Sequence, residues 1–306
     1  MPAEGIHLLA LADTLLATPS AAAATRLPPL RAAARLGAVF VDLPYFDRFG
    51  QAVLNYVLGR QQAPSRWGDL LHHRSPIELG RRLGEASVRL GAASATREEG
   101  QLLHALALGY ISHAAVDTSM HPMVNRLALE RTAALGAKTT ASQQHQEVEK
   151  YQSVLFHEER LGFDMMGDAR LTDYIHIDFA PLVRPGPLAQ AVAEALRLTH
   201  GDAPTAAEFG RWTRGYGHYT RILRSPLGKT IVTAKDKRRE RPALYDRLDF
   251  PARFAEAVAL SRRYVEAMHS YLTDGAFDAS AQAALARIIP EGSIDPGAPG
   301  APGAPA

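Results

Sequence analysis

Residues 107–125, ALGYISHAAVDTSMHPMVN, place His113, Asp117 and His121 at successive intervals of four positions. An α-helix has about 3.6 residues per turn, so each interval rotates the side chain by only about 40°. The three side chains therefore project from one face over two turns. Buried imidazole and carboxylate groups need polar partners, and both are preferred ligands of divalent metal ions. The stretch predicts a metal-binding face around which the rest of the chain is arranged.

The segment that carries this face is predicted to be a long, buried helix. Residues 101–116 are almost entirely apolar or small, apart from His104, Ser112 and His113. Thr96 followed by Glu99 has the pattern of a capping box, so we expect a helix from about residue 96 to 125 that is buried on most sides. His104 lies nine positions before His113 and falls off its face, and we interpret it as structural.

The composition limits the class of protein. The chain has 306 residues, 46% of them hydrophobic and 22% charged, as is typical of soluble globular proteins. A net charge of +2 gives no argument for nucleic acid or an anionic membrane as partner. The chain has no cysteine, which excludes disulfides and thiolate metal sites. Any metal ion must be held by His, Asp and Glu.

The two ends of the chain give two further expectations. No apolar run reaches the roughly 18 residues that span a bilayer. The first 24 residues lack a basic start, and Glu4, His7 and Asp13 interrupt their apolar run, so we expect a mature helix of a cytoplasmic protein rather than a signal peptide. At the other end, PGAPGAPGAPA is low-complexity sequence. We expect one all-α domain over residues 1–290 and a disordered tail over 291–306.

Other segments are also predicted to be helical from their apolar spacing. They cover residues 5–17, 20–36 with an interruption at Pro28 and Pro29, 67–83, 140–162, 187–200, 206–225 and 250–272. Ser75 with Glu78 suggests a capping box and Ser142 a helix cap. Residues 172–183 fit a strand or a loop, and 233–242 (TAKDKRRERP) are predicted to be a basic loop, solvated or in contact with a phosphate headgroup.

Outside the central helix, several residues of metal-ligand type each have an ordinary alternative explanation. His7, near an apolar helix face, is equally typical of a hydrogen-bonded core histidine. Asp42 follows an apolar run and precedes Pro44, so it is either a helix cap or a site carboxylate. His72 and His73 are adjacent, and only one of them is expected to face the site.

A similar pair lies in the segment 140–162. His145 and Glu149 are four residues apart on one helix face, a spacing that suits one metal ion but also a solvated polar pair. Glu147 and His157 lie off that face. Considered together with the central helix, these segments supply eight residues of ligand type, more than a mononuclear site uses, and so indicate a cluster of two or three zinc ions. The eight are His7, Asp42, His72, His113, Asp117, His121, His145 and Glu149.

The combination resembles the zinc-dependent phospholipase C family, which belongs to a helical superfamily that also contains single-strand-specific zinc nucleases. The resemblance covers about residues 5–160. It is carried by His7, by VDLPYF and WGDLLHH, by the GYISHAAVDTSMHP helix, and by HQEVE further on.

The resemblance implies a division of the ligands. Asp42, His72, His113 and Asp117 would surround one zinc ion, with Asp117 bridging toward a neighbour; a second ion would be held by His121, His145 and Glu149; and His7 would help to hold a third. In secreted members a free N-terminal amine is also a ligand of the third ion, a role that here would fall to Pro2 after removal of Met1. His72 is preferred over His73 because of its spacing from Gly68.

The implied activity is zinc-dependent hydrolysis of a phospholipid or a related phosphodiester. Zinc lowers the pKa of bound water to about 7, and the resulting hydroxide would attack the phosphorus. Asp42 would serve as ligand or as general base. We expect transient contact with a membrane surface, and we expect Trp212, Tyr216 and Tyr219 to lie beside the path of the substrate. The alternatives are a non-catalytic metal-stabilised scaffold and a single-strand nuclease, the latter disfavoured by the near-neutral charge.

Overall fold

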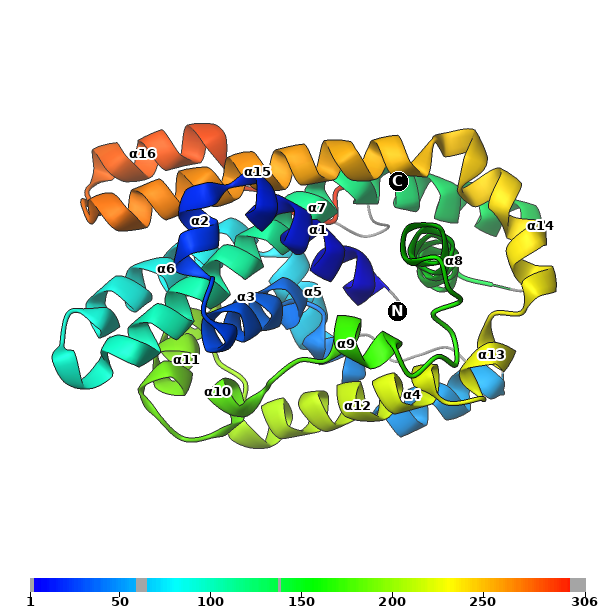
Figure 1. Cartoon of the computed structure of the whole chain (residues 1–306), viewed down its shortest axis with the longest axis horizontal. Coiled ribbons are helices and arrows are strands. Elements are labelled where there is room, and N and C mark those ends of the chain that lie inside the picture. Colours follow the sequence, from blue (N-terminus) through cyan, green and yellow to red (C-terminus); the bar gives the residue numbers. More distant parts are fainter. Residues whose placement is uncertain (1–2, 59–64, 137–138, 298–306) are drawn as a thin grey trace.

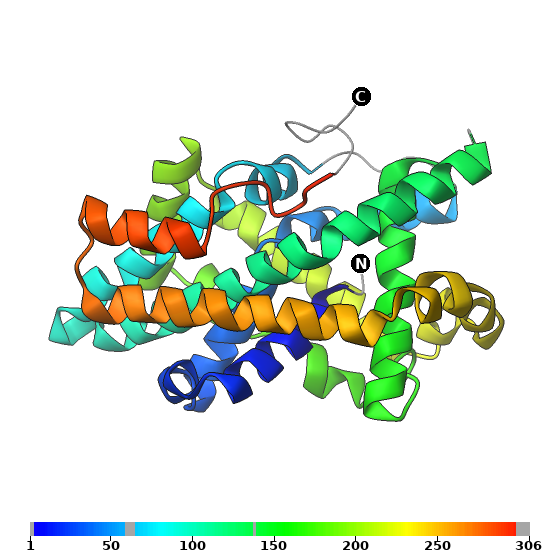
Figure 2. The same cartoon turned by 90° about the horizontal axis from the view of Figure 1, so that it is seen from above.

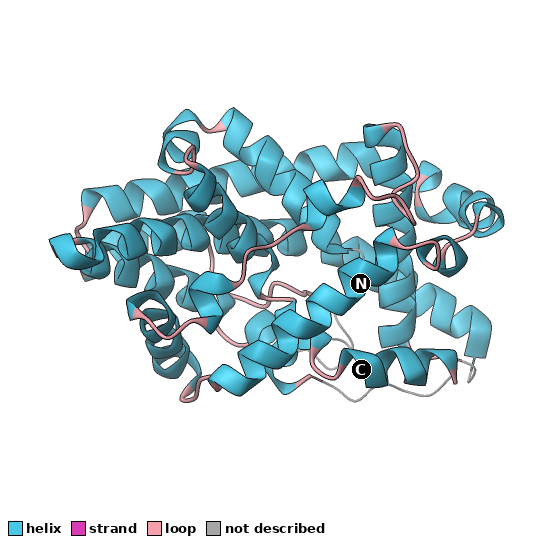
Figure 3. Ribbon diagram, turned by 60° about the horizontal axis from the view of Figure 1, so that its bottom comes forward, coloured by secondary structure: helices cyan, strands magenta, loops and turns pink. Residues whose placement is uncertain are grey.

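Figure 1 shows the chain as a computed structural model, which describes residues 3–58, 65–136 and 139–297. Within these ranges the regular structure is helical and no β-strand forms (Figure 3). The prediction of an all-α fold is confirmed. None of the described helices is both long and apolar enough to cross a membrane.

The central helix is α7, Arg97–Leu135, which is ten residues longer than expected at its C-terminal end. It packs against four long helices, as the two orthogonal views show for α15 in particular (Figures 1 and 2): α3 (Pro28–Phe40), α6 (Pro76–Gly91), α8 (Ala141–Leu161) and α15 (Phe250–Asp274). The helix ends at Gly136, whose φ of 63° suits glycine far better than other residues. A helix covered on several sides explains why its sequence is apolar almost all round.

Two glycines bring α3 and α7 into backbone contact. A Cβ on Gly37 would lie 2.0 Å from the Leu106 carbonyl oxygen, and one on Gly109 would lie 1.9 Å from that of Ala34. No larger side chain fits at either position. The close approach brings the C-terminal end of α3, and Asp42 just after it, next to the polar face of α7.

The remaining helices surround this core. They are α1 (Ala3–Ala17), α2 (Pro19–Ala24), η1 (Leu43–Phe46), α4 (Phe49–Val57), α5 (Arg66–His73), η2 (Ser94–Thr96), α9 (Leu171–Ile175), α10 (Ala180–Val183), α11 (Pro187–His200), α12 (Ala206–Arg224), α13 (Gly228–Ile231), α14 (Ala234–Leu244), η4 (Asp246–Leu248) and α16 (Ala279–Ile288). Of these, α1 lies between α15, α3 and α7 and places its N-terminal turns against the site. Of the segment 172–183, expected to be a strand or a loop, residues 172–175 belong to α9, 176–179 are loop and 180–183 form α10.

The prediction of a basic loop at 233–242 is wrong, because these residues form most of α14. Thr233 and Asp236 make a reciprocal capping box that starts the helix. Two of its cations are paired with carboxylates of α8: Lys237 Nζ lies 2.8 Å from Glu158, and Arg241 lies 2.6 Å from Glu159. The side-chain ion pairs across to α8 explain why a run of charges folds as a helix here.

Three predicted helix caps also differ from the structure. Ser75 precedes α6 in a left-handed conformation without a capping hydrogen bond, and Thr96 likewise makes no cap. The Thr96 hydroxyl donates instead to the Leu90 carbonyl, at 2.6 Å. In α8 the cap is Thr140, in a box with Gln143, and not Ser142. At Thr96 a hydrogen bond to the preceding turn replaces the cap, at Ser75 a left-handed turn does so, and in α8 a second local capping box lies two residues before the predicted cap.

The prediction of a disordered tail from residue 291 is wrong for residues 291–297. Ile294 is 1% exposed, and its backbone N–H donates to the His72 carbonyl at 3.0 Å. This short segment returns to the main core after α16. The final residues, 298–306, lie outside the described ranges.

Candidate metal centre

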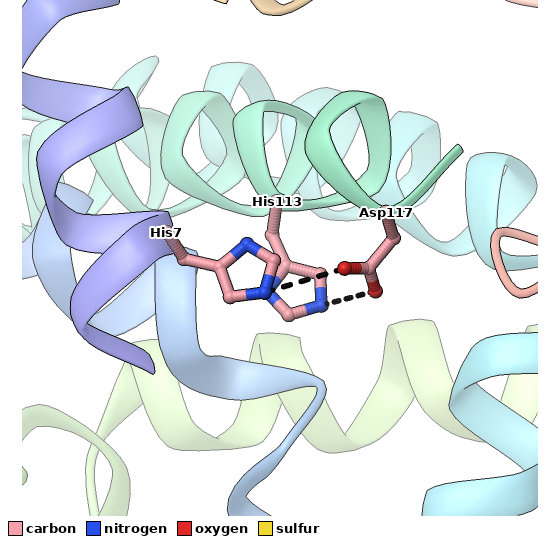
Figure 4. Close-up of side chains that lie close together, drawn as sticks. All are labelled: His7, His113 and Asp117. Atoms are coloured by element: carbon pink, nitrogen blue, oxygen red, sulfur yellow. Dashed lines mark ion pairs between the residues drawn. The ribbon is translucent and has the colours of Figure 1, made fainter. Parts of the chain in front are cut away.

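The face predicted on α7 lies at the centre of the molecule. His113, Asp117 and His121 are only 1%, 2% and 5% exposed. The Asp117 carboxylate is approached by imidazoles from three helices. Its Oδ1 lies 3.2 Å from Nε2 of His7, on α1, and 3.3 Å from Nε2 of His121. Its Oδ2 lies 2.9 Å from Nε2 of His113 and 3.7 Å from Nε2 of His72, on α5. Figure 4 shows His7 and His113 directed at this carboxylate.

The other predicted residues complete the cluster from two sides. Asp42, between α3 and η1, makes no capping hydrogen bond and instead lies with Oδ1 3.4 Å from His72 Nε2. On α8, Glu149 Oε1 lies 3.3 Å from His145 Nε2 and 3.4 Å from His121 Nε2. The structure therefore brings all eight candidate residues together.

The ligand-type atoms fall into three groups, within each of which they lie no more than 4.8 Å apart. The groups are His7 with His113 and Asp117, Asp42 with His72 and His113, and His121 with His145 and Glu149. His113 belongs to two groups, yet one imidazole nitrogen has a single lone pair and can bind one ion. The grouping of His121, His145 and Glu149 matches the division that the sequence resemblance implies, whereas Asp117 is grouped with His7 and His113 rather than with Asp42 and His72.

Three of the imidazoles have a fixed tautomer, because their Nδ1 atoms lie against acceptors. Nδ1 of His113 donates to the Ala38 carbonyl and Nδ1 of His72 to the Gly68 carbonyl, each at 2.8 Å. Nδ1 of His145 donates to Oδ1 of Asn125 at 2.7 Å. A donating Nδ1 leaves Nε2 with a free lone pair, which is how metal-binding histidines are usually oriented.

The spacing of these atoms fits zinc. A tetrahedral zinc with bonds of about 2.0–2.1 Å holds its ligand atoms roughly 3.3 Å apart. The separations from His7 to Asp117, from His121 to Asp117 and from His145 to Glu149 are 3.2, 3.3 and 3.3 Å. His113 Nε2 and Asp117 Oδ2 are both buried and lie 2.9 Å apart, yet neither has a hydrogen bond. Both atoms are thus available to a cation.

The charge states of the site also suit metal binding. Burial alone would raise the pKa of Asp117, but the surrounding imidazoles, His113 first, hold it well below the usual range. The pKa of Asp42 is lowered in the same way. Burial, assisted by His113, lowers the pKa of His7 to about 4, which keeps that imidazole neutral. Burial also opposes a proton on His113, but Asp117 and Asp42 outweigh it and raise the pKa to about 9. A cation at this position would displace that proton.

Two residues of the site were missed by sequence reasoning. Asp295 Oδ1 lies 2.9 Å from Nδ1 of His121, although it belongs to the segment predicted to be disordered. Glu4 is 4% exposed, accepts a 3.3 Å hydrogen bond from the Tyr219 hydroxyl, and has a pKa raised to about 8, mainly by burial. The only sequence signal for Glu4 is its position one turn before His7. Asp295 has no local signal.

Other histidines and acids take no part in the cluster. His73 Nδ1 lies 2.9 Å from the Ser293 hydroxyl, and His104 Nε2 lies 3.2 Å from His269 Nδ1 on α15. Glu147 forms an ion pair with Lys150, and His157 is buried against α1. These positions agree with the sequence interpretation. The predicted N-terminal ligand, Pro2, lies outside the described residues.

The aromatic residues of α12 differ from the expectation. Trp212, Tyr216 and Tyr219 are 1%, 2% and 7% exposed, and the Tyr216 hydroxyl donates to the Ile175 carbonyl at 2.8 Å. They belong to the core rather than to the path of a substrate. Their apolar rings pack at helical spacing against η1, α4 and α10.

A helical fold around a buried set of histidines and carboxylates at metal-ligand spacing is the arrangement expected of a helical metal-binding protein. The family model described as zinc-dependent phospholipase C matches residues 6–191, and the chain belongs to that family. The name of the family implies a zinc-dependent, phospholipase C-like hydrolase with a phospholipid substrate. No curated protein and no solved structure matches the chain.

Proposed function

We propose that the cluster holds two or three zinc ions and hydrolyses the phosphodiester bond of a phospholipid or a related compound. The observation that carries this proposal is the position of Asp117, which is buried among four imidazole nitrogens at 2.9–3.7 Å. A buried carboxylate surrounded by imidazole nitrogens is stabilised when metal ions bind between them. A purely structural core has no need of so many polar groups.

We assign the candidate ligands to three ions. His113, His72 and Asp117 would hold one ion, His121, His145 and Glu149 a second, and His7 would contribute to a third. When bound, zinc polarises phosphoryl oxygens and activates water at neutral pH. Asp42 is the carboxylate at the edge of the cluster, with 14% of its side chain exposed. It would act on the nucleophilic water, either as a zinc ligand or by accepting the proton of that water.

The wall beside the cluster favours a lipid-like substrate. A cavity of about 30 Å³ borders His7, Asp117 and Glu149, and apolar side chains such as Ile6 and Phe250 complete its lining. Among the described residues, neither arginine nor lysine reaches this cavity. Nucleic-acid sites usually bring cations to the phosphates, and Lys237 and Arg241 of α14 are engaged in ion pairs. These features support a phospholipid, met at a membrane surface, over a nucleic acid.

The test compares wild-type protein with Asp117→Asn on a nitrophenyl phosphocholine, before and after chelation. The amide has the same shape but lacks the charge that binds the ions, so we expect turnover to fall to the level of chelated wild-type protein. Asp274→Asn, on the exposed end of α15, is the matched control and should keep full activity. Turnover that survives both Asp117→Asn and chelation would contradict the proposal.

A non-catalytic, metal-stabilised scaffold is the second candidate. The small volume of the cavity, about 30 Å³, favours it, because closed coordination leaves no room for substrate. A scaffold would bind zinc in stoichiometric amounts and show no turnover on phosphodiesters of any size. The same experiment, with zinc content measured on each sample, separates the two candidates.

A further inference from the structure

The segment after α16 returns to the metal-binding cluster. In Figure 2 it runs back from α16 (red) over the middle of the molecule. Its backbone is attached to the end of α5, because Ile294 N–H donates to the His72 carbonyl at 3.0 Å and Ser293 Oγ contacts the same carbonyl at 3.4 Å. The Ile294 side chain is 1% exposed. These contacts bring Asp295 to the wall of the site.

Asp295 lies behind two candidate ligands, at ion-pair distance from His121 and hydrogen-bonded to the amide that contacts His145. Its Oδ1 lies 2.9 Å from Nδ1 of His121 and accepts a 2.6 Å hydrogen bond from Nδ2 of Asn125. The same amide donates to the Pro296 carbonyl at 3.1 Å. Its oxygen, Oδ1 of Asn125, accepts from Nδ1 of His145 at 2.7 Å. One carboxylate thus acts on both imidazoles, directly on His121 and through the amide on His145.

This arrangement distinguishes one group of ligands from the other. Nδ1 of His72 and Nδ1 of His113 donate to carbonyls of α5 and α3, which the helical backbone itself fixes in place. The rings of His121 and His145 depend instead on side chains. Acceptors behind metal-binding imidazoles fix the ring orientation and raise the basicity of the ligand, and their loss typically weakens metal binding about 10–100-fold.

We propose that Asp295 is a positioning residue that orients His121 and, through Asn125, His145, so that their Nε2 atoms converge with Glu149 on one metal ion. The inference rests on the proposed metal binding of the site. It assigns to the C-terminal segment a role in a centre whose ligands all lie before residue 150. Asp295 therefore acts on only one of the proposed metal positions, the one formed by His121, His145 and Glu149.

The test measures metal content and does not depend on hydrolysis. Wild-type protein, Asp295→Ala, Asp295→Asn and the exposed control Asp274→Ala are dialysed against a weak chelator, and the zinc per chain is counted. We expect Asp295→Ala to lose one equivalent, with about 10–100-fold weaker binding at that position. Asp295→Asn keeps an acceptor but not the charge, so it should be intermediate. The control should match wild-type protein.

Cobalt substitution supplies the second readout, because the visible absorption of bound Co²⁺ reports the ligand geometry. In Asp295→Ala only part of the wild-type spectrum should be lost, and circular dichroism establishes that the chain is folded. Full metal content with an unchanged spectrum would overturn the inference. Equal loss of every equivalent from folded protein would overturn it as well, since the effect would not belong to one position. If wild-type protein binds zinc but hydrolyses no phosphodiester, the proposed activity fails and the inference about Asp295 stands.

Discussion

At the scale of single residues, the sequence predicts a ligand when a local rule fixes its direction. His113, Asp117 and His121 share a face because of helical periodicity, and His145 with Glu149 follows the same rule. Asp295 obeys no such rule, because its place beside His121 depends on a chain segment that returns from a distant helix. Local patterns therefore predicted these five candidate ligands, whereas His7, Asp42 and His72 were recognised only in combination with them, and Asp295 was not predicted.

His157 gives a prediction about pH. Its Nδ1 donates to the Ser153 carbonyl at 2.7 Å, and burial lowers its pKa to about 4. Because the ordinary value is about 6.5, the folded chain resists a proton that the unfolded chain accepts. The stabilisation is complete above pH 6.5 and declines toward pH 4 by about 3 kcal/mol.

The change to make is His157→Asn, which can still donate a hydrogen bond but does not titrate. Urea unfolding at pH 7.0 and 4.5, with a chelator in both samples, should show a smaller loss of unfolding free energy on acidification than in wild-type protein. The variant will be less stable at pH 7.0. The quantity to compare is therefore the change in unfolding free energy between pH 7.0 and 4.5 in each protein. An identical difference in the two proteins would show that His157 does not contribute to acid sensitivity.

At the scale of elements, apolar spacing predicted the long helices, and polar patterns were less reliable. The start of α7 was placed correctly near residue 97 although Thr96 makes no cap. The end was set too early, at about residue 125, whereas the helix continues to Leu135. α14 was missed because a run of charges resembles a loop unless its partners on α8 are known. The apolar spacing was enough to predict that a long helix forms. The residues at which a helix begins and ends depended on contacts that no local pattern contains.

The close crossing of α3 and α7 gives a prediction about Gly109. Gly109→Ala adds a methyl group that would lie 1.9 Å from the Ala34 carbonyl oxygen, so the two helices must move apart. We expect the unfolding free energy to fall by about 3 kcal/mol. The zinc content should also fall, since the His113 to Ala38 hydrogen bond spans the same crossing.

Gly217, in α12, is the matched control, because a Cβ there would meet no atom within 4 Å. Gly217→Ala should raise the unfolding free energy by about 0.5–1 kcal/mol, since alanine favours a helix interior over glycine. Denaturant unfolding of both variants measures the two effects. Equal effects of the two substitutions would mean that the close crossing is not what requires glycine at residue 109.

At the scale of the whole molecule, the cluster connects parts of the chain that are far apart in the sequence. His7 comes from the first helix, and Asp295 follows the last one. The family match ends at residue 191, whereas Phe250 in the cavity wall and Asp295 lie beyond it. For residues 165–290 the sequence predicted helices and, beside the substrate path, Trp212, Tyr216 and Tyr219, which lie in the core instead. Phe250 was not predicted to line the site, because long-range contacts leave no periodic signal.

The last prediction concerns removal of the metal. Because the ligands come from α1, α5, α7, α8 and the turn after α3, bound zinc stabilises the packing of the folded chain over the unfolded one. Zinc present at about 1,000 times its Kd raises the unfolding free energy by about 4 kcal/mol for each site. For a chain of this size about 2 °C per kcal/mol is expected, so chelation should lower Tm by roughly 8 °C for each site emptied.

Differential scanning calorimetry with and without a chelator measures this shift, and restoring zinc should reverse it. Asp117→Asn is the informative variant, because it removes the carboxylate that four imidazoles approach. Its Tm should respond much less to chelator than that of wild-type protein, while Asp274→Asn should respond fully. A wild-type Tm that ignores both chelator and added zinc would show that the cluster holds no ion. The buried carboxylate and imidazoles would then have to stabilise the fold as ion pairs alone, at a high cost of desolvation.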